Sequence, residues 1–294
     1  MKIIVTGAMG QLGHAVRKLS SGSDHTFVFT DMNESEGVSR LDITDREAVK
    51  SMTDGADVIV NCAAYTDVNG AEVNESVAMK VNAEAPGILA EAAREAGALL
   101  MHISTDYVFD GKGNVPYDEE AQPSPVNAYG RTKLEGEKAI AASGCRYMIF
   151  RTSWLYSDVG KNFYLTMNRL TAEKPEIKVV MDQTGTPTNA YDLAFLLCHI
   201  IENGMLDKTG IYNYSNDGVC SWYDFAVEIA RAVGHTACEI HPCHSSEFPS
   251  KVTRPAFSVL DKTKIKRTFG VEIPHWRESM IYCLKRIVMQ QQAN

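Results

Sequence analysis

The chain begins with a strand pattern that runs directly into a turn of regularly spaced glycines. Residues 2–6 are mostly apolar, and Gly7, Gly10 and Gly13 follow at intervals of three as a helical pattern starts. The first glycine lets the chain turn sharply, the second lets the backbone approach a phosphate, and the third lets the helix pack closely on the sheet. The free N–H groups at the start of that helix attract phosphate. This strand–turn–helix unit predicts a dinucleotide site.

Short apolar runs alternate with helical patterns through the first half of the chain. Strands are expected at residues 2–6, 26–31, 57–61, 99–105 and 146–151, and helices at 11–20, 45–52, 76–96 and 129–142. Strands that alternate with helices pair in parallel through right-handed crossovers. Runs that are apolar throughout indicate strands covered by helices on both faces. The fold class expected is therefore α/β, with a Rossmann-type doubly wound parallel sheet.

The pattern changes after about residue 151, where the spacing becomes irregular and polar loops lengthen. Loops are expected at residues 217–218 and 242–255. We expect a dinucleotide-binding Rossmann domain at residues 1–155 and, at 156–294, mainly a smaller C-terminal α/β substrate-binding lobe. The chain is expected to cross back to the first domain around residues 178–213. A length of 294 residues allows both units a core of their own.

The composition argues against several classes of protein. Hydrophobic residues make up 45% of the chain, a globular rather than a disordered share. The net charge of -8 argues against a nucleic-acid binder, which usually carries a basic stripe. No apolar run approaches the roughly 18 residues of a membrane span, and the first residues do not resemble a signal peptide. We therefore expect a cytoplasmic protein that binds neither nucleic acid nor membrane.

Seven cysteines are scattered along the chain, most of them in apolar surroundings, as is typical of reduced core cysteines. Cys238, His241, Cys243 and His244 form the one cluster that suggests a metal. Its C-x4-C spacing lies within the range of zinc sites, but a second pair of ligands does not follow. The sequence therefore predicts a strand and loop in this segment, and no metal.

Asp31 closes the second predicted strand, at the place where a carboxylate accepts hydrogen bonds from the adenosine ribose. A carboxylate there repels a 2′-phosphate, which favours NAD over NADP. Arg40 lies close in sequence and would favour a 2′-phosphate, so NADPH and NADH both stay open as the cofactor. Asp42 and Ile43 are expected to flank the adenine.

Tyr129 and Lys133 stand four residues apart on a predicted helix and therefore share one face. A cation beside a phenol lowers the pKa of the phenol from its usual value of about 10. Tyr129 is thus expected to act as a general acid, with Lys133 tuning it and holding the nicotinamide ribose. Thr105 ends a strand on the same sheet edge, where its hydroxyl would bond a substrate carbonyl oxygen. With the glycine turn, these residues predict reduction of a ketone by a nicotinamide cofactor.

Longer motifs resemble one family of the extended short-chain dehydrogenase/reductase superfamily. Residues 102–111, 125–130, 151–156, 162–163, 182–188 and 254–255 are similar to the signatures of dTDP-4-dehydrorhamnose reductases. The resemblance covers essentially the whole chain. It implies NADPH- or NADH-dependent reduction of the C4 ketone of dTDP-4-dehydro-L-rhamnose to dTDP-L-rhamnose, a step of nucleotide-sugar and polysaccharide biosynthesis.

The resemblance also implies roles at the matching positions. Tyr129 would be the proton donor, and Lys133 its partner. Together with the glycine turn, the expected cofactor contacts are Gly7, Gly10, Gln11, Leu12, Gly13, Asp31, Asp42, Ile43, Ala63, Ala64, Tyr65, Ile103, Tyr129 and Lys133. The expected substrate contacts are Thr105, Asp106, Trp154, Asn162 and Arg254, with Trp154 as a wall of the sugar site and Arg254 at the diphosphate.

Two departures from the family pattern stand out. Residues 67–72 read Asp-Val-Asn-Gly-Ala-Glu where relatives usually carry Asp-Val-Asp-Lys-Ala-Glu, so a charged pair near the cofactor is missing. Some relatives form magnesium-bridged dimers through carboxylates, and this chain has Ala15 and Tyr191 at those places. A monomer without metal is therefore expected in preference to a metal-bridged dimer.

Two alternative functions stay open at this point. One relative of the family is a non-catalytic regulatory subunit of methionine adenosyltransferase, although retention of Thr105, Tyr129 and Lys133 together favours an enzyme. The other alternative is a reductase or epimerase of another 4-keto-6-deoxy nucleotide sugar. A dehydratase is disfavoured, because Asp106 is followed by Tyr107 and only one carboxylate is available to abstract a proton.

Overall fold

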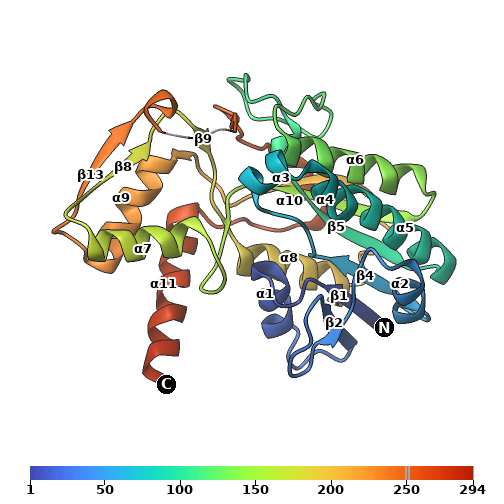
Figure 1. Cartoon of the computed structure of the whole chain (residues 1–294). Coiled ribbons are helices and arrows are strands. Elements are labelled where there is room, and N and C mark those ends of the chain that lie inside the picture. The colour runs from blue at the N-terminus through green and yellow to red at the C-terminus, as the bar shows by residue number, and fades with distance from the viewer. Residues whose placement is uncertain (249, 251, 294) are drawn as a thin grey trace.

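The structure is a computed structural model that describes residues 1–248, 250 and 252–293. Its centre is a parallel sheet of seven strands in the order β11-β6-β5-β4-β1-β2-β3 (Figure 1). The strands are β1 (Lys2–Thr6), β2 (Thr26–Asp31), β3 (Ser39–Arg40), β4 (Val58–Asn61), β5 (Leu99–Thr105), β6 (Arg146–Thr152) and β11 (Gly210–Tyr214). The predicted α/β fold with a doubly wound parallel sheet is confirmed, and β1, β2 and β5 occupy the residues expected of them.

Helices cover both faces of this sheet, which explains why its strands are apolar throughout. In β1, Ile3 and Val5 point to one face and Ile4 to the other, and all three are fully buried. The first face packs against α1 (Gln11–Leu19), α8 (Ala190–Glu202) and α10 (Thr263–Phe269). The second face packs against α2 (Arg46–Thr53), α5 (Ala85–Ala96) and α6 (Ala128–Ala142). A strand whose side chains alternate between two cores has no face left for polar residues.

The predicted helix at residues 76–96 is a continuous helical run with a wider turn inside it. It consists of α4 (Glu75–Met79), the π-helical turn η1 (Lys80–Glu84) and α5, and the short helix α3 (Val68–Val73) precedes it. Asn82 lies in η1 and holds the backbone of Tyr65 at two points. Its Oδ1 accepts from the Tyr65 N–H at 2.8 Å, and its Nδ2 donates to the Tyr65 carbonyl at 3.0 Å. The wider turn thus fixes the segment that follows β4.

Beside the main sheet lies a second lobe with a core of its own (Figure 1). It contains α7 (Phe163–Glu173), β8 (Glu176–Val180), α9 (Trp222–Val233), β13 (Glu239–Cys243) and the first part of α11 (Trp276–Ala293). Short pairs link it to the rest: β7 (Leu155–Tyr156) with β10 (Thr188–Asn189), and β9 (Thr184–Gly185) with β12 (Cys220–Ser221). Single turns are η2 (Asp106–Val108) and η3 (Ser245–Glu247). The division of the chain near residue 155 stays a prediction.

The loop expected at residues 242–255 begins later than predicted. Pro242 and Cys243 belong to β13, which pairs with β8 in parallel, and residues 249 and 251 lie outside the described residues. All seven cysteines are free. Within the described chain, His, Cys, Asp and Glu side chains do not form a group of three that could hold a metal ion. In the same residues, no helix is long and apolar enough to cross a membrane.

Candidate active site

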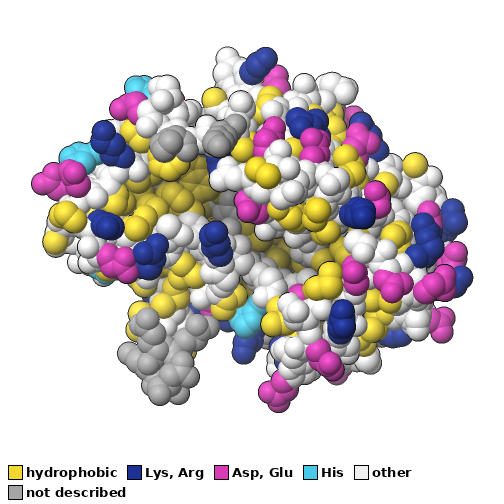
Figure 2. Space-filling model, in the orientation of Figure 1, with side chains coloured by type: hydrophobic (Ala, Val, Ile, Leu, Met, Phe, Trp, Pro, Cys, Tyr) yellow, Lys and Arg dark blue, Asp and Glu magenta, His cyan; other side chains and the backbone are white. Residues whose placement is uncertain are grey.

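The carboxyl ends of the sheet strands and the second lobe enclose a cavity of about 840 Å³. Figure 2 shows a hollow between the two parts, with hydrophobic side chains along its wall. Parallel sheets bind ligands at this edge, because the loops that leave the strands diverge there. Of the residues expected to bind cofactor or substrate, all line this cavity except Gly13 and Asn162.

The glycine turn after β1 is built so tightly that two of its glycines could not carry side chains. Gly7 has a positive φ of 66°, and a Cβ there would lie 2.6 Å from the backbone nitrogen of Ala63. Gly13 lies beneath the cavity wall, where a Cβ would stand 2.2 Å from the Gly7 carbonyl oxygen. Gly10 is the N-cap of α1 and offers no side-chain cap to the first N–H groups of the helix, and Gly10, Gln11 and Leu12 all line the cavity.

At one end of the cavity, the Asp31 carboxylate is held in place by the glycine turn. Its Oδ2 accepts a hydrogen bond from the Met9 N–H at 2.9 Å. Asp42 lines the same end, and its Oδ1 accepts from the Thr44 hydroxyl at 2.7 Å. Arg40 is exposed and lies outside the wall that the described residues form around the cavity. This end of the cavity is therefore acidic.

The helix α6 carries Tyr129 and Lys133 to the centre of the cavity. Asn127 caps the helix, because its side chain accepts from the Gly130 N–H at 2.9 Å. A Cβ on Gly130 would lie 2.1 Å from the Tyr107 carbonyl oxygen, so glycine lets the helix start close to the end of β5. The rings of Tyr107 and Tyr129 meet edge to face at 5.7 Å. Tyr129 thereby faces the same cavity as Thr105.

The surroundings of Tyr129 do not make its phenol acidic, contrary to the sequence-based expectation. Burial raises the pKa of Tyr129 above its usual value, and a hydrogen bond with Thr105 opposes that shift only in part. The ring itself is half-buried, since one side faces the open cavity, so a ligand there would alter the shift. In this structure the phenol is a protonated donor at neutral pH.

Lys133 is fully buried and directed toward β5. Its Nζ donates to the Ile103 carbonyl at 2.6 Å and lies 3.4 Å from Nε2 of His102. Burial lowers the pKa of Lys133 to about 8. Burial also keeps the pKa of His102 well below its ordinary range, and the charge of Lys133 adds to that effect. The ammonium is therefore close to a neutral acceptor and can lose its proton more readily than a surface lysine.

Asp106 follows Thr105 in the floor of the cavity and is nearly completely buried. Burial raises its pKa to about 7, although hydrogen bonds from Ser258 and Thr105 oppose the shift. The Thr105 hydroxyl lies 3.0 Å from Oδ1 of Asp106. The other oxygen, Oδ2, is buried without a hydrogen-bond partner among the described residues. A carboxyl group in this state exchanges its proton near neutral pH.

Two tryptophans form the wall on the side of the second lobe. Trp154 has a φ of 47°, a left-handed conformation that is unusual for any residue but glycine. Its ring stacks on Trp222 with centroids 3.6 Å apart. Gly185 lets the ring approach, because a Cβ there would lie 2.7 Å from Trp154 Cε2. Sequence reasoning missed Trp222, whose signal is its place directly after Ser221, the N-cap of α9.

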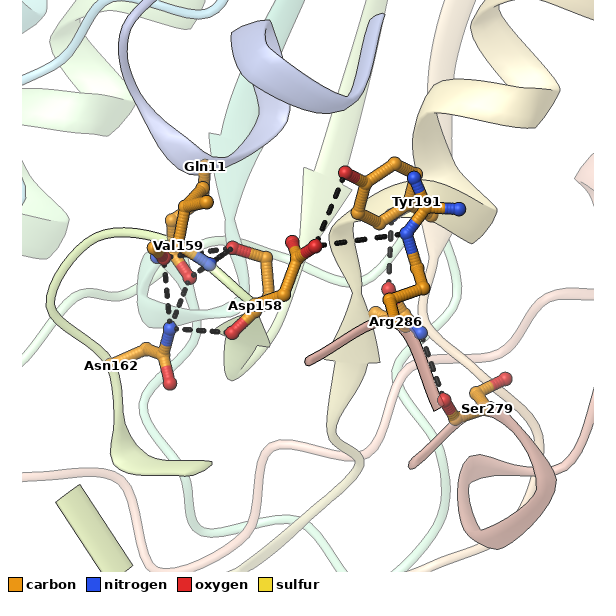
Figure 3. Close-up of polar contacts among 9 residues, drawn as sticks. Gln11, Asp158, Val159, Asn162, Tyr191, Ser279 and Arg286 are labelled. Atoms are coloured by element: carbon orange, nitrogen blue, oxygen red, sulfur yellow. Dashed lines mark hydrogen bonds and ion pairs between the residues drawn. The ribbon is translucent and has the colours of Figure 1, made fainter. Parts of the chain in front are cut away.

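Arg254 lines the cavity, and its Nη1 lies 3.4 Å from the Tyr107 hydroxyl. Asn162, by contrast, does not belong to the cavity wall formed by the described residues, and its expected contact with substrate stays a prediction. It caps α7 by accepting from the Leu165 N–H at 2.9 Å, and its Nδ2 donates to Oε1 of Gln11 at 2.9 Å. Figure 3 shows Asn162 and Gln11 facing each other across the seam between the lobes.

Comparison with known proteins agrees with the resemblance seen in the motifs. Residues 1–289 match the family described as "RmlD substrate binding domain". The chain is 38% identical to the dTDP-4-dehydrorhamnose reductase of Burkholderia thailandensis, over 99% of this chain and 100% of that protein. A second relative with that name, from Sinorhizobium fredii, is also 38% identical, over 95% of each chain.

Solved structures of such reductases have the same fold. The protein from Clostridium acetobutylicum is 41% identical, with a TM-score of 0.91 over 98% of this chain and 100% of that one. The protein from Bacillus anthracis, solved in complex with NADP, is 34% identical, with a TM-score of 0.87 over 97% of this chain and 99% of that one. Because the family match and these relatives span almost the whole sequence, this chain belongs to the dTDP-4-dehydrorhamnose reductase family.

Proposed function

We propose that this protein reduces the C4 ketone of dTDP-4-dehydro-L-rhamnose to dTDP-L-rhamnose, with NADH or NADPH as the reductant. The observation that carries the proposal is one cavity lined by Thr105, Tyr129 and Lys133 together with the glycine turn. Membership of the reductase family supports the same reaction. A cavity that retains all three reactive side chains also favours an enzyme over a regulatory subunit.

The cavity fits a dinucleotide in its chemistry. The glycine turn has no room for Cβ atoms at Gly7 and Gly13, and it presents helix N–H groups to the cavity. Such N–H groups bind phosphate oxygens. Ala63 and Ala64 leave open space in the wall between the turn and the reactive groups. Asp31 stands at one end to accept hydrogen bonds from ribose hydroxyls, and Lys133 stands near the other.

The reaction requires a proton at the ketone oxygen while hydride reaches the carbon. When bound, the reduced nicotinamide supplies that hydride. Tyr129 donates its phenolic proton to the ketone oxygen, and its raised pKa keeps the proton in place until the oxygen becomes basic. Lys133, one helical turn away on the same face of α6, would hold the nicotinamide ribose. Thr105 donates a hydrogen bond to the same oxygen, and a protonated Asp106 leaves the threonine hydrogen free to do so.

Replacement of the phenol tests this assignment. Tyr129→Phe should abolish NAD(P)H oxidation in the presence of the 4-keto sugar nucleotide, because the proton donor is lost. Binding of the cofactor and of dTDP should stay near the wild-type level, as measured by titration calorimetry. Tyr147→Phe, near the start of β6 and outside the cavity wall that the described residues form, is the matched control. Normal turnover by Tyr129→Phe would remove the phenol from the mechanism.

The identity of the sugar needs a product analysis. Incubation of the wild-type chain with both cofactors and a panel of 4-keto-6-deoxy nucleotide sugars, followed by NMR, distinguishes a rhamnose from a talose product. An epimerase would give its product without net oxidation of NAD(P)H. A chain that binds cofactor tightly but turns over no sugar in the panel would favour the regulatory alternative.

The preferred cofactor is NADH in this proposal, although the Bacillus anthracis relative was solved with NADP. The carboxylate of Asp31 is fixed by Met9 at the acidic end of the cavity, where a 2′-phosphate would meet a like charge. We expect kcat/KM to be higher with NADH than with NADPH. Asp31→Asn should reduce this preference by roughly tenfold, because the neutral amide no longer repels the phosphate. An unchanged ratio of kcat/KM values would refute the role of Asp31.

A monomer without bridging metal is also proposed. Ala15 is fully buried, and the ring of Tyr191 is covered by the Arg286 guanidinium at 3.5 Å. Neither side chain offers a carboxylate oxygen to a divalent cation. Light scattering should therefore give the mass of one chain in magnesium and in a chelator alike, and a dimer that dissociates in the chelator would contradict this expectation.

A further inference from the structure

The loop of residues 157–162 reaches from the second lobe to the glycine turn. The Ser157 hydroxyl and the Asn162 amide both donate to Oε1 of Gln11, at 3.3 and 2.9 Å. Gln11 is the first residue of α1 and lines the cavity. Asn162 also donates to the carbonyls of Ser157 and Val159, which closes the loop on itself (Figure 3). This loop, here called the clasp, joins the two lobes beside the dinucleotide turn.

The clasp is anchored on its other side by a charged contact with the C-terminal helix. The side chain of Asp158 is fully buried, and its Oδ2 lies 3.7 Å from Nε of Arg286 and 3.5 Å from the Tyr191 hydroxyl. Arg286 extends from α11, and its guanidinium lies flat on the Tyr191 ring (Figure 3). Contacts at both ends therefore hold the clasp in one position relative to the turn.

Gly160 and Lys161 form the part of the clasp that lines the cavity. Gly160 has a positive φ of 74°, and a Cβ there would stand 3.3 Å from Cγ of Gln11. The next residue, Lys161, is exposed, and its ammonium forms no hydrogen bond or ion pair with any residue that the structure describes. The residue that carries this unpaired cation therefore directly follows the position that approaches the first residue of α1.

The other cations of the cavity are committed elsewhere. Of the described residues that line it, Lys133, Lys161 and Arg254 carry positive charge. Lys133 is bound to the Ile103 carbonyl, and Arg254 is directed to Tyr107. The first turn of α1 offers N–H groups but no charged side chain to an anion. Among the described residues that line the cavity, Lys161 is therefore the cation without a partner of its own that could balance two negative charges at this turn.

We propose that Lys161 binds the diphosphate of the nicotinamide cofactor and that the clasp positions it there. This inference rests on the cofactor named in the proposed function. The glycine turn supplies N–H donors from the sheet side, and Lys161 supplies a charged donor from the second lobe, so that the diphosphate is held between the lobes. The diphosphate of the sugar nucleotide is the rival ligand, and Arg254 stands on that side.

The test measures binding rather than turnover. Lys161→Met keeps most of the side-chain length and removes the charge, Lys161→Arg keeps the charge, and Lys174→Met removes an exposed charge at the end of α7 as a control. The dissociation constants for NADH and for dTDP are measured by titration calorimetry at low and high salt.

We expect NADH to bind roughly tenfold more weakly to Lys161→Met, with less dependence on salt, and dTDP to bind as before. Lys161→Arg should restore most of the NADH affinity, and Lys174→Met should match the wild type. The inference is overturned if Lys161→Met binds NADH normally, if it loses dTDP affinity instead, or if both ligands weaken equally. A wild-type chain that binds NADH but reduces no sugar nucleotide would defeat the proposed function and leave this test valid.

Discussion

The buried ion pair behind the reactive groups provides a quantitative test of how the fold holds α6 in place. Arg151 on β6 and Glu137 on α6 are almost completely buried, with side-chain exposures of 3% and 4%. The guanidinium donates to both carboxylate oxygens, with Nε–Oε1 at 3.0 Å and Nη2–Oε2 at 2.7 Å. Ser104 donates to the same carboxylate at 2.5 Å. This pair joins the sheet to the helix that carries Tyr129.

The perturbation is Arg151→Met, which leaves the Glu137 carboxylate buried with only Ser104 as a donor. A buried charge that loses its partner costs about 3–5 kcal/mol of the free energy of unfolding. Arg151→Met with Glu137→Leu removes both charges and leaves only the Ser104 hydroxyl unpaired, at a cost of about 1–3 kcal/mol. The coupling energy of the cycle should then be roughly 3 kcal/mol or more.

The assay is equilibrium unfolding in urea, followed by circular dichroism and by tryptophan fluorescence so that coincident transitions can be required. Glu137→Leu completes the cycle, and Glu137→Gln serves as a control that keeps the shape of the side chain while removing its charge. A double variant that is as unstable as either single variant would refute the reasoning, because the losses would then come from packing rather than from an unpaired charge.

Three further predictions concern residues in the cavity wall or next to it. The folded-state pKa of Asp106, about 7, lies above its unfolded value, so the free energy of unfolding should fall by on the order of 4 kcal/mol as pH rises from about 4 to 7. The check is to measure the free energy of unfolding of the wild type and of Asp106→Asn across this pH range. An equal pH dependence in both proteins would contradict the role of Asp106. Gly13→Ala should lower the free energy of unfolding by about 1–3 kcal/mol, since its Cβ would meet backbone atoms. The same variant should bind NADH more weakly in calorimetry. Wild-type stability and wild-type NADH affinity would contradict this prediction. Trp222→Ala removes the stacking partner of Trp154 and should raise KM for the sugar nucleotide roughly tenfold, with NADH affinity unchanged. An unchanged KM in steady-state kinetics would show that the two tryptophans do not contact the sugar nucleotide.

The elements that the sequence predicts well are those whose signal is local. The run of apolar residues in β1 and the glycine spacing after it determine both the strand and the turn, because each depends on steric limits within about ten residues. The π-helical turn at Asn82 has no such signal. Its reason is a contact with Tyr65, 17 residues earlier in the chain, which only the folded structure brings together.

Contacts between the lobes were also beyond sequence reasoning. The motif around Asn162 predicts a substrate contact but gives no sign that its amide donates to Gln11, more than one hundred residues away. Trp222 and Lys161 reach the cavity from elements whose place beside the sheet depends on packing in the second lobe. Local motifs in this sequence therefore indicate that a site exists. They do not indicate which side chains of a loop point toward that site.

The reactive pair illustrates the same limit in its energetics. The spacing of Tyr129 and Lys133 predicts correctly that both lie on one helical face, because that follows from 3.6 residues per turn. The sign of the pKa shift depends on how deeply the side chain is buried, and burial is a property of the whole fold. Here burial outweighs charge: it raises the pKa of Tyr129 and lowers that of Lys133 to about 8. Both shifts favour neutral forms, so in the proposed reaction the phenol would act as an acid that releases its proton only when the ketone oxygen gains charge.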